Sequence, residues 1–435
     1  MSPTLLSAYF SQLATISTLR WRGRITQVVG QLIESEGPLS RVGEACEILD
    51  SHGLSWPGEV IGFRGNNVLS MALRRPTGIR HGDQVIALGR RPSLGVSDEL
   101  IGRVLDGAGL PMDGGPIPFT RERCPLDREA PAALDRTPIR EPLGCGIRAV
   151  DALLTCGRGQ RVGIFGGSGV GKSTLIGMMA RNTNADLTVL GLIGERGREV
   201  GELLNALGPA GRRRSVVVVS TSDQDPLLRI RASLAATTIA EYFCTKGKNV
   251  LLVVDSLTRL GMAQREIGLA AGEPPTAKGY TPSVFTMLAR LLERAGAFGG
   301  GTITGFYTVL MEGDDENDPL VDAARALLDG HVMLDRRLAA QNHYPPISIL
   351  DSVSRIMPAV ITREHLAKAG EIRRLLATYK ASEELIRIGA YQRGGDPDVD
   401  RAIAVLPGLR EFLTQSIDQP AGLKESIDGL IALAV

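Results

Sequence analysis

Between residues 21 and 91, hydrophobic and polar positions tend to alternate in short runs. Gly, Pro, Asn and Ser separate these runs at a spacing of roughly ten residues, which is typical of the strands of a small antiparallel β-barrel. The pattern therefore predicts an N-terminal barrel. Its expected strands are residues 23–29, 31–34, 45–49, 58–62, 67–71 and 83–87.

The hydrophobic pattern changes after a connector rich in Pro and Gly at residues 105–145, where we expect little regular structure. From residue 159 to residue 360, apolar runs alternate with segments of helical character. This alternation indicates an α/β fold, in which helices cover a mostly parallel sheet. The expected strands are residues 163–165, 187–192, 215–220, 249–255 and 303–310.

The two ends of the chain have helical patterns. From about residue 362 onward the chain reads as helices, and breaks at 389–397, 407–408 and 420–422 predict four segments. Residues 3–19 predict a short amphipathic helix that docks onto a partner or packs on its own chain. The apolar face of that helix would carry Leu5, Leu6, Tyr9, Phe10 and Leu13. The expected divisions of the chain are 1–20, 21–95, 96–361 and 362–435.

Composition limits the function classes. A length of 435 residues predicts two or three domains, and a formal net charge of +1 offers no global reason to bind nucleic acid. The five cysteines are widely spaced without a C-x-x-C pair, which argues against a zinc site or a disulfide framework. No apolar run approaches the about 18 residues of a membrane span, and no leader pattern is evident. We therefore expect a cytoplasmic protein.

Residues 166–173 form a complete G-x-x-x-x-G-K-[ST] phosphate-binding loop between a β-prone run and a helix-compatible segment. In such a loop, glycines allow close approach of backbone N–H groups to phosphate oxygens, Lys172 reaches the β- and γ-phosphates, and Ser173 ligates Mg²⁺. The chain is therefore expected to bind ATP with Mg²⁺. The expected nucleotide-binding residues here are Gly166, Gly167, Ser168, Gly169, Val170, Gly171, Lys172, Ser173 and Thr174.

Hydrolysis requires groups beyond the loop: an acid that organises the metal, a group that orients water, and positive charge. Asp255 ends an apolar strand and fits the acid that holds Mg²⁺. Glu195 follows another apolar run and is the candidate for orienting water, although a surface Glu–Arg ladder explains the same residues. Arg196 and Arg259 either neutralise the γ-phosphate or pair with these acids.

Two later residues are weaker candidates from the sequence alone. Tyr344 is a candidate for stacking on the adenine, and Arg355 for an arginine finger that completes the site of a neighbouring subunit. Spacing by itself favours ordinary core or surface positions for both.

Four segments together resemble the type III export ATPases of flagellar and injectisome secretion, which are related to the catalytic subunits of rotary ATP synthases. They are PLGCGIRAVD at 142–151, GLIGERGREV at 191–200, GEPPTAKGYTPSVF at 272–285 and EGDD at 312–315. The resemblance implies a RecA-like core with an N-terminal β-barrel and a C-terminal helical domain, assembled as a homohexamer. It implies hydrolytic roles for Lys172, Ser173, Glu195, Arg196, Asp255 and Arg259, adenine stacking by Tyr344 and a finger at Arg355.

The resemblance also implies partners. A stator or regulator protein would bind the N-terminus, and a central stalk protein would enter a pore lined by residues 266–280. Secretion chaperones, export substrates and the membrane export gate would complete the set, with the enzyme peripheral at the inner membrane. Two departures, Thr281 and Ser348, concern only local loop geometry.

Three other functions share this core. The catalytic subunit of a rotary synthase carries an acidic run in its helical domain, but residues 389–400 contain none. An RNA translocase needs a basic, aromatic platform, which this barrel lacks. A non-hydrolysing ring subunit would have lost Lys172 or Glu195. Residues 178–181 and 189–192 favour flagellar over injectisome export.

Overall fold

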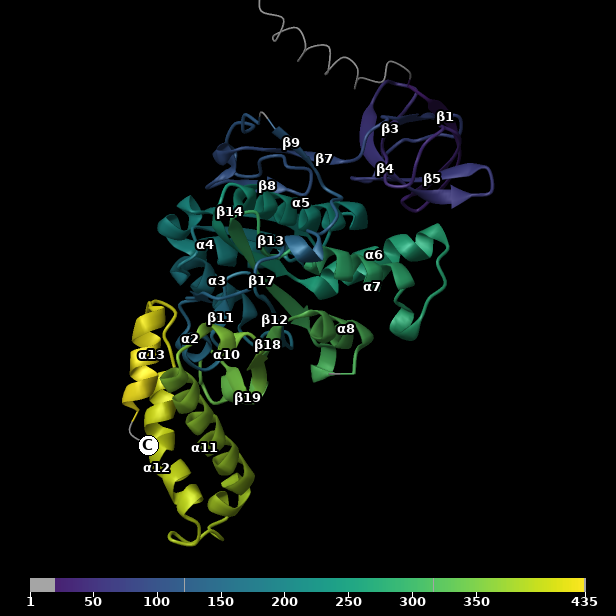
Figure 1. The fold of residues 1–435 in the computed structure, drawn as a ribbon. Coiled ribbons are helices and arrows are strands. Elements are labelled where there is room, and N and C mark those ends of the chain that lie inside the picture. Colours follow the sequence, from purple (N-terminus) through teal and green to yellow (C-terminus); the bar gives the residue numbers. More distant parts are fainter. Residues whose placement is uncertain (1–19, 121, 316, 434–435) are drawn as a thin grey trace, which may run out of the picture.

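A computed structural model describes residues 20–120, 122–315 and 317–433. Figure 1 shows three parts: a barrel in purple, a central layer of sheet and helices in blue to green, and a group of helices in yellow-green at the far end. The expected helix at 3–19, with its docking role, lies outside the described residues. None of the helices in the described part of the chain has the length and apolar character that crossing a bilayer requires.

The barrel is closed and antiparallel, as the alternating pattern predicted. Its strands follow the order β1-β2-β5-β4-β3-β6, and β6 pairs back onto β1. Ile25, Ile33, Ile48, Val60 and Val85 point inward and are buried, while the residues between them face outward in part. The strands are β1 Arg22–Val29, β2 Leu32–Glu36, β3 Ala45–Leu49, β4 Ser55–Arg64, β5 Asn67–Ala72 and β6 Gln84–Ala87.

The central sheet has nine strands in the described residues, in the order β19-β18-β12-β17-β15-β13-β14-β8, with β16 pairing on β17. The strands from β18 to β8 are parallel, and β19 and β16 run antiparallel to their neighbours. The bounds are β8 Val104–Asp106, β12 Arg161–Gly166, β13 Leu187–Glu195, β14 Ser215–Thr221, β15 Asn249–Asp255, β16 Gly296–Phe298, β17 Gly301–Leu310, β18 Gly330–Leu334 and β19 Ile347–Ser354.

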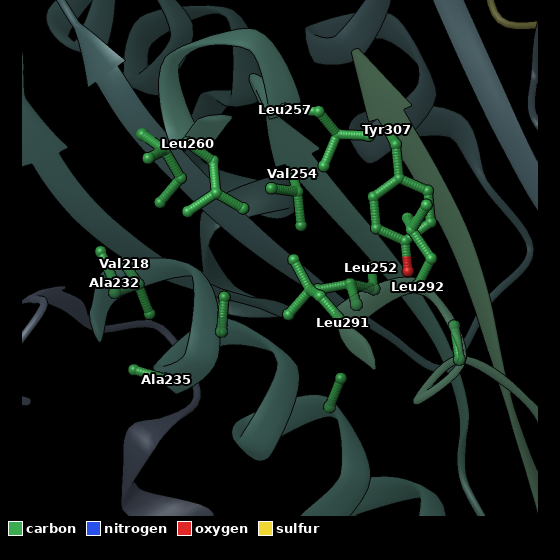
Figure 2. Packing of buried hydrophobic residues seen from close by; sticks show 14 of the residues in the cluster. Val218, Ala232, Ala235, Leu252, Val254, Leu257, Leu260, Leu291, Leu292 and Tyr307 are labelled. Carbon is green, nitrogen blue, oxygen red and sulfur yellow. The ribbon is translucent and has the colours of Figure 1, made fainter. Parts of the chain in front are cut away.

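Helices cover both faces of this sheet, which explains why its strands are apolar on both sides. One face packs against α5 to α8, where Leu252 and Val254 of β15 meet Leu260 and Leu291 (Figure 2). The other face packs against α2 to α4. The helices are α2 Arg148–Leu153, α3 Lys172–Asn182, α4 Gly197–Arg213, α5 Pro226–Thr245, α6 Leu257–Ala271, α7 Pro282–Leu292, α8 Pro319–Leu327, α9 Arg336–Ala340 and α10 Met357–Val360.

The connector contains more structure than its composition indicated. Its first residues belong to β8, the edge strand that pairs with β14, and β7 Ser93–Val96 pairs with β9 Glu122–Pro125. A further short pair joins β10 Pro142–Leu143 to β11 Cys156–Gly157. These strands have two to four residues, so the sequence offers little periodicity to detect. The 3₁₀ turns are η1 Asp98–Leu100, η2 Ala133–Asp135, η3 Ala277–Gly279 and η4 Glu312–Asp314.

The C-terminal part has three helices in the described residues, α11 Arg363–Arg387, α12 Pro397–Leu413 and α13 Leu423–Ala432, so the prediction of four segments was wrong. The expected break at Pro407-Gly408 lies inside α12. Proline usually breaks a helix because it lacks the N–H and crowds the preceding turn. Here Val405, Leu409 and Leu413 bury one face of α12 against its neighbours, and this packing outweighs the local cost.

Candidate active site

The phosphate-binding loop connects β12, in the middle of the sheet, to the first turn of α3. Gly169 and Gly171 have φ angles of 77° and 98°, which disfavour a residue with a Cβ. Gly171 is the residue directly before α3, so the backbone N–H groups of the helix start face the loop. A cavity of about 510 Å³ lies over this loop, lined by Ser168, Gly169, Gly171, Lys172, Ser173 and Thr174 among others.

Lys172 is the most informative residue of the loop. It is only 9% exposed, and its Nζ finds no hydrogen-bond partner within the described part of the chain. Burial lowers the pKa of this amine, while the nearby carboxyls of Asp255 and Glu195 act in the opposite direction. A buried, unpaired ammonium is costly unless an anion approaches it. The amine is therefore placed to receive a phosphate oxygen.

The residues predicted to hold Mg²⁺ share the wall of the same cavity. Asp255 ends β15 and is buried, and one of its oxygens accepts a hydrogen bond from the Thr308 hydroxyl. Burial raises the pKa of Asp255, which a cation beside it would counteract. Ser173 lies on the adjoining first turn of α3. A carboxylate, a hydroxyl and phosphate oxygens are the donors that Mg²⁺ prefers, so these residues fit the ion.

Among the described residues, no group of three or more His, Cys, Asp or Glu side chains is arranged to hold a metal.

Glu195 ends β13, the strand next to β15, so its carboxyl faces the same cavity. Burial raises its pKa to about 8, helped by a hydrogen bond to Glu199 and by the charge of Asp255. The hydrogen bond from Glu195 lowers the pKa of Glu199, which is more exposed. These opposite shifts in pKa favour the proton on Glu195 over Glu199.

The two arginines differ in environment. Arg259 lies on the first turn of α6 and packs on Gly194, where a Cβ would come within 2.8 Å of the Arg259 Cβ. Its Nε is buried without a partner in the described residues. The Arg196 side chain is 75% exposed and lies 3.7 Å from the Glu199 carboxylate at the rim of the cavity.

Tyr344 and Arg355 lie at opposite ends of β19. The Tyr344 ring lies beside the phosphate loop. A Cβ added to Gly171 would be 3.9 Å from the ring atom Cε1, an ordinary van der Waals distance. Arg355 donates its backbone N–H to Asp329 at 3.0 Å, and Asp329 in turn bonds to Arg161 at the start of β12. The six residues of β12, at about 3.3 Å each, separate Arg355 from its own phosphate loop by about 20 Å.

Known proteins resemble this chain over most of its length. The nucleotide-binding domain of the ATP synthase alpha/beta family matches residues 146–354, and the β-barrel domain of that family matches residues 25–89. The C-terminal domain of the T3SS EscN ATPase matches residues 361–432. A flagellum-specific ATP synthase of Bacillus subtilis (strain 168) is 51% identical over 94% of both chains. The chain belongs to the family of flagellar and type III secretion ATPases.

Solved structures agree with this assignment. The assembled ATPase EscN of the enteropathogenic E. coli type III secretion system superposes with a TM-score of 0.90 at 44% identity, covering 94% of this chain and 99% of that one. A type 3 secretion system ATPase of Sinorhizobium fredii is 46% identical over 97% of this chain and 94% of its own length. This export ATPase therefore has the predicted RecA-like core, and it hydrolyses ATP to energise type III protein export.

Sequence reasoning missed several residues that line the cavity of this export ATPase. Glu199 lies on the first turn of α4, four residues after Glu195 at the end of β13, and this short separation along the chain could have revealed it. Thr258, Met262 and Glu312 also line the cavity, and no local pattern distinguishes them. Thr308, which holds Asp255, lies on a different strand and is found only from the sheet.

Proposed function

We propose that this export ATPase uses Mg²⁺ and the residues of the 510 Å³ cavity to hydrolyse ATP as a flagellar export enzyme. The observation that carries the proposal is the buried Lys172 amine, which has no hydrogen-bond partner among the described residues, in the same cavity as the Glu195 and Asp255 carboxyls. Lys172 binds the β- and γ-phosphates, and Arg196 and Arg259 neutralise the charge that develops on the γ-phosphate. Ser173 and Asp255 hold Mg²⁺, whose chemistry is to neutralise phosphate charge.

Glu195 orients the attacking water in this proposal, once its proton has left. The base of ATP stacks on Tyr344, whose ring is half-exposed beside Gly171. The remaining loop residues, Gly166, Gly167, Ser168, Gly169, Val170 and Thr174, shape the phosphate cradle.

The active enzyme is a homohexamer in this proposal. Two structures support it: EscN was solved as an assembled ATPase, and also in complex with its central stalk EscO at a TM-score of 0.88 to this chain. Arg355 then acts as the finger on a neighbouring subunit, since it is about 20 Å from its own phosphate loop. The segment at 266–280, which begins within α6 and includes η3, lines the pore that receives a stalk protein in this proposal.

We further propose that the enzyme works in the cytoplasm at the inner-membrane export apparatus. There it releases chaperones from export substrates and delivers the substrates to the export gate. A stator or regulator binds its N-terminus, and the functional divisions of the chain are 1–20, 21–95, 96–361 and 362–435. Residues 178–181 and 189–192 favour flagellar over injectisome export in this proposal. Overall identity does not separate the two systems, at 51% to a flagellum-specific ATP synthase of Bacillus subtilis (strain 168) and 49% to a SPI-2 type 3 secretion system ATPase of Salmonella typhimurium.

A complementation experiment tests the function. The gene is deleted in its host and replaced by wild type, by Glu195→Gln, or by Glu129→Gln as a control at an exposed carboxylate of the connector. Wild type and Glu129→Gln should restore filaments and secreted flagellar protein, and Glu195→Gln should not. Purified Glu195→Gln should bind ATP normally but hydrolyse it about 10²–10⁴-fold more slowly, the usual contribution of an acid–base group.

Each result distinguishes a different part of the proposal. Normal filaments in the deletion strain would indicate that the protein serves an injectisome instead of a flagellum. Loss of filaments with full rescue by Glu195→Gln would remove Glu195 from the hydrolytic machinery.

A further inference from the structure

Residues 414–419 form a turn between α12 and α13, and one side chain of this turn is buried. Gln415 is 2% exposed, while the other residues of the turn are exposed. Its side-chain oxygen accepts a hydrogen bond from the Arg148 backbone N–H at 2.9 Å. Its amide nitrogen donates to the carbonyls of Gly146 and Gln419, each at 2.9 Å. Gln415 therefore joins the 414–419 turn to the segment that precedes α2.

Two arginines from the core also hold the 414–419 turn. The Arg148 guanidinium donates to the Thr414 carbonyl. Arg181, on the last turn of α3, donates to the Ile417 carbonyl and lies 3.6 Å from the Asp418 carboxylate. Because α3 begins at Lys172, the turn is fixed to the same helix that carries the phosphate-binding residues.

The 414–419 turn is bonded directly to the residue beside the phosphate loop. The backbone N–H of Gln415 donates to the Tyr344 carbonyl at 2.8 Å. The neighbouring Thr414 hydroxyl lies 3.2 Å from Nδ1 of His343. Tyr344 is 44% exposed, so the surrounding side chains do not enclose it. Its backbone is held by the turn at the Tyr344 carbonyl and by α9, where the His343 N–H donates to the Leu338 carbonyl at 3.0 Å.

We propose that Gln415 is a positioning residue for nucleotide binding. By fastening the 414–419 turn to the core, it fixes the backbone of Tyr344 and so the orientation of the ring that stacks on the base. This inference rests on the proposed stacking role of Tyr344. It assigns the C-terminal helices a specific part in nucleotide binding, because Gln415 belongs to the turn between two of them.

If Gln415 positions Tyr344, its loss should weaken the binding of the base but not of the phosphates, because different parts of the site hold them. A nucleotide uses both the phosphate loop and Tyr344, whereas inorganic tripolyphosphate uses the loop alone. Gln415→Met keeps the side-chain volume but removes its hydrogen bonds. It should weaken ADP binding about tenfold, corresponding to one or two net hydrogen bonds, and change tripolyphosphate binding less than about twofold.

Both affinities are measured by calorimetry on the full-length protein with Mg²⁺. Gln392→Met, at an exposed glutamine of the same helical domain, is the matched control and should change neither. Arg181→Met loosens the same turn from its partly exposed side and should repeat the pattern if Gln415→Met does not fold. Tyr344→Ala should weaken ADP selectively, and combining it with Gln415→Met should add little further loss, as expected for coupled residues.

The outcomes separate the two proposals. If Tyr344→Ala leaves ADP binding unchanged, the stacking role fails. If Tyr344→Ala weakens ADP but Gln415→Met and Arg181→Met do not, the positioning role of Gln415 is overturned. Equal loss of ADP and tripolyphosphate affinity in Gln415→Met would also overturn it, since that result indicates general damage to the site.

Discussion

Glu195 shows how the environment of a single residue adapts it to a task. Burial beside Asp255, with a hydrogen bond to Glu199, raises its pKa from 4.5 to about 8. Between these two values the folded protein holds a proton that the unfolded chain releases. The folded state therefore becomes less stable as pH rises through that window, because the carboxyl ionises freely only in the unfolded chain. This cost in stability is located at the position where the reaction needs a base.

The raised pKa of Glu195 predicts the pH dependence of activity. Because an ionised carboxylate is required to orient water, kcat/KM should increase with pH through an ionisation near 8 and then level off. Glu199→Gln removes the neighbouring negative charge that favours the proton on Glu195, so the ionisation should move to lower pH. Steady-state ATPase assays from pH 6 to pH 9 measure both profiles. An identical profile in Glu199→Gln would show that the proton is not shared.

At the scale of elements, α12 is a helix that tertiary packing maintains against its own sequence. Pro407 and Gly408 are both exposed within it, yet the buried face formed by Val405, Leu409 and Leu413 continues through them. A Cβ at Gly408 would meet only the Leu433 side chain, at an ordinary 3.9 Å. The two residues therefore carry an intrinsic helix cost without a visible structural use.

Replacing these residues should stabilise α12. Gly408→Ala is expected to contribute about 0.5–1 kcal/mol, and Pro407→Ala up to about 3 kcal/mol, because the helix regains a hydrogen bond and loses a steric clash. Hydrogen exchange of the α12 amides measures the local change, with α3 amides as an internal reference. Faster exchange in α12 of either variant would mean that the proline or glycine serves a bend that the helix needs.

At the scale of the whole molecule, the sheet itself separates Arg355 from the phosphate loop of the same chain. They lie at opposite ends of strands, so a finger role for Arg355 requires a second subunit. The ring interface would then be heterologous, with each subunit completing the site of its neighbour. A single subunit would bind ATP but hydrolyse it slowly.

Mixing two inactive variants tests this arrangement. Arg355→Ala retains its own phosphate loop, and Lys172→Ala retains its finger. Each alone should be inactive, but a 1:1 mixture assembled into rings should regain up to about one quarter of wild-type activity, the fraction of sites with both parts intact. ATPase activity of the mixture is compared with that of each variant at equal total concentration. Mixed rings without any recovery would contradict a finger that acts between subunits.

The sequence by itself determined the features that depend on neighbouring residues. Alternation set the barrel strands, apolar runs set five strands of the sheet, and glycines that tolerate positive φ set the phosphate loop at Gly169 and Gly171. Asp255 was a candidate because it ends an apolar strand, whereas for Glu195 the local pattern left a surface Glu–Arg ladder open, and only the family resemblance implied its role. Both residues end adjacent parallel strands, so their carboxyls lie at one edge of the sheet.

Only the tertiary structure decided which distant segments meet. The edge strand β8, the continuous helix α12 and the contact of Tyr344 with the phosphate loop all depend on packing between segments far apart in sequence. Gln415 reads in the sequence as an ordinary polar residue, and its burial among backbone groups of three segments appears only after folding. The physical reason is that short-range patterns record propensity and burial, whereas the choice of partner is a property of the assembled core.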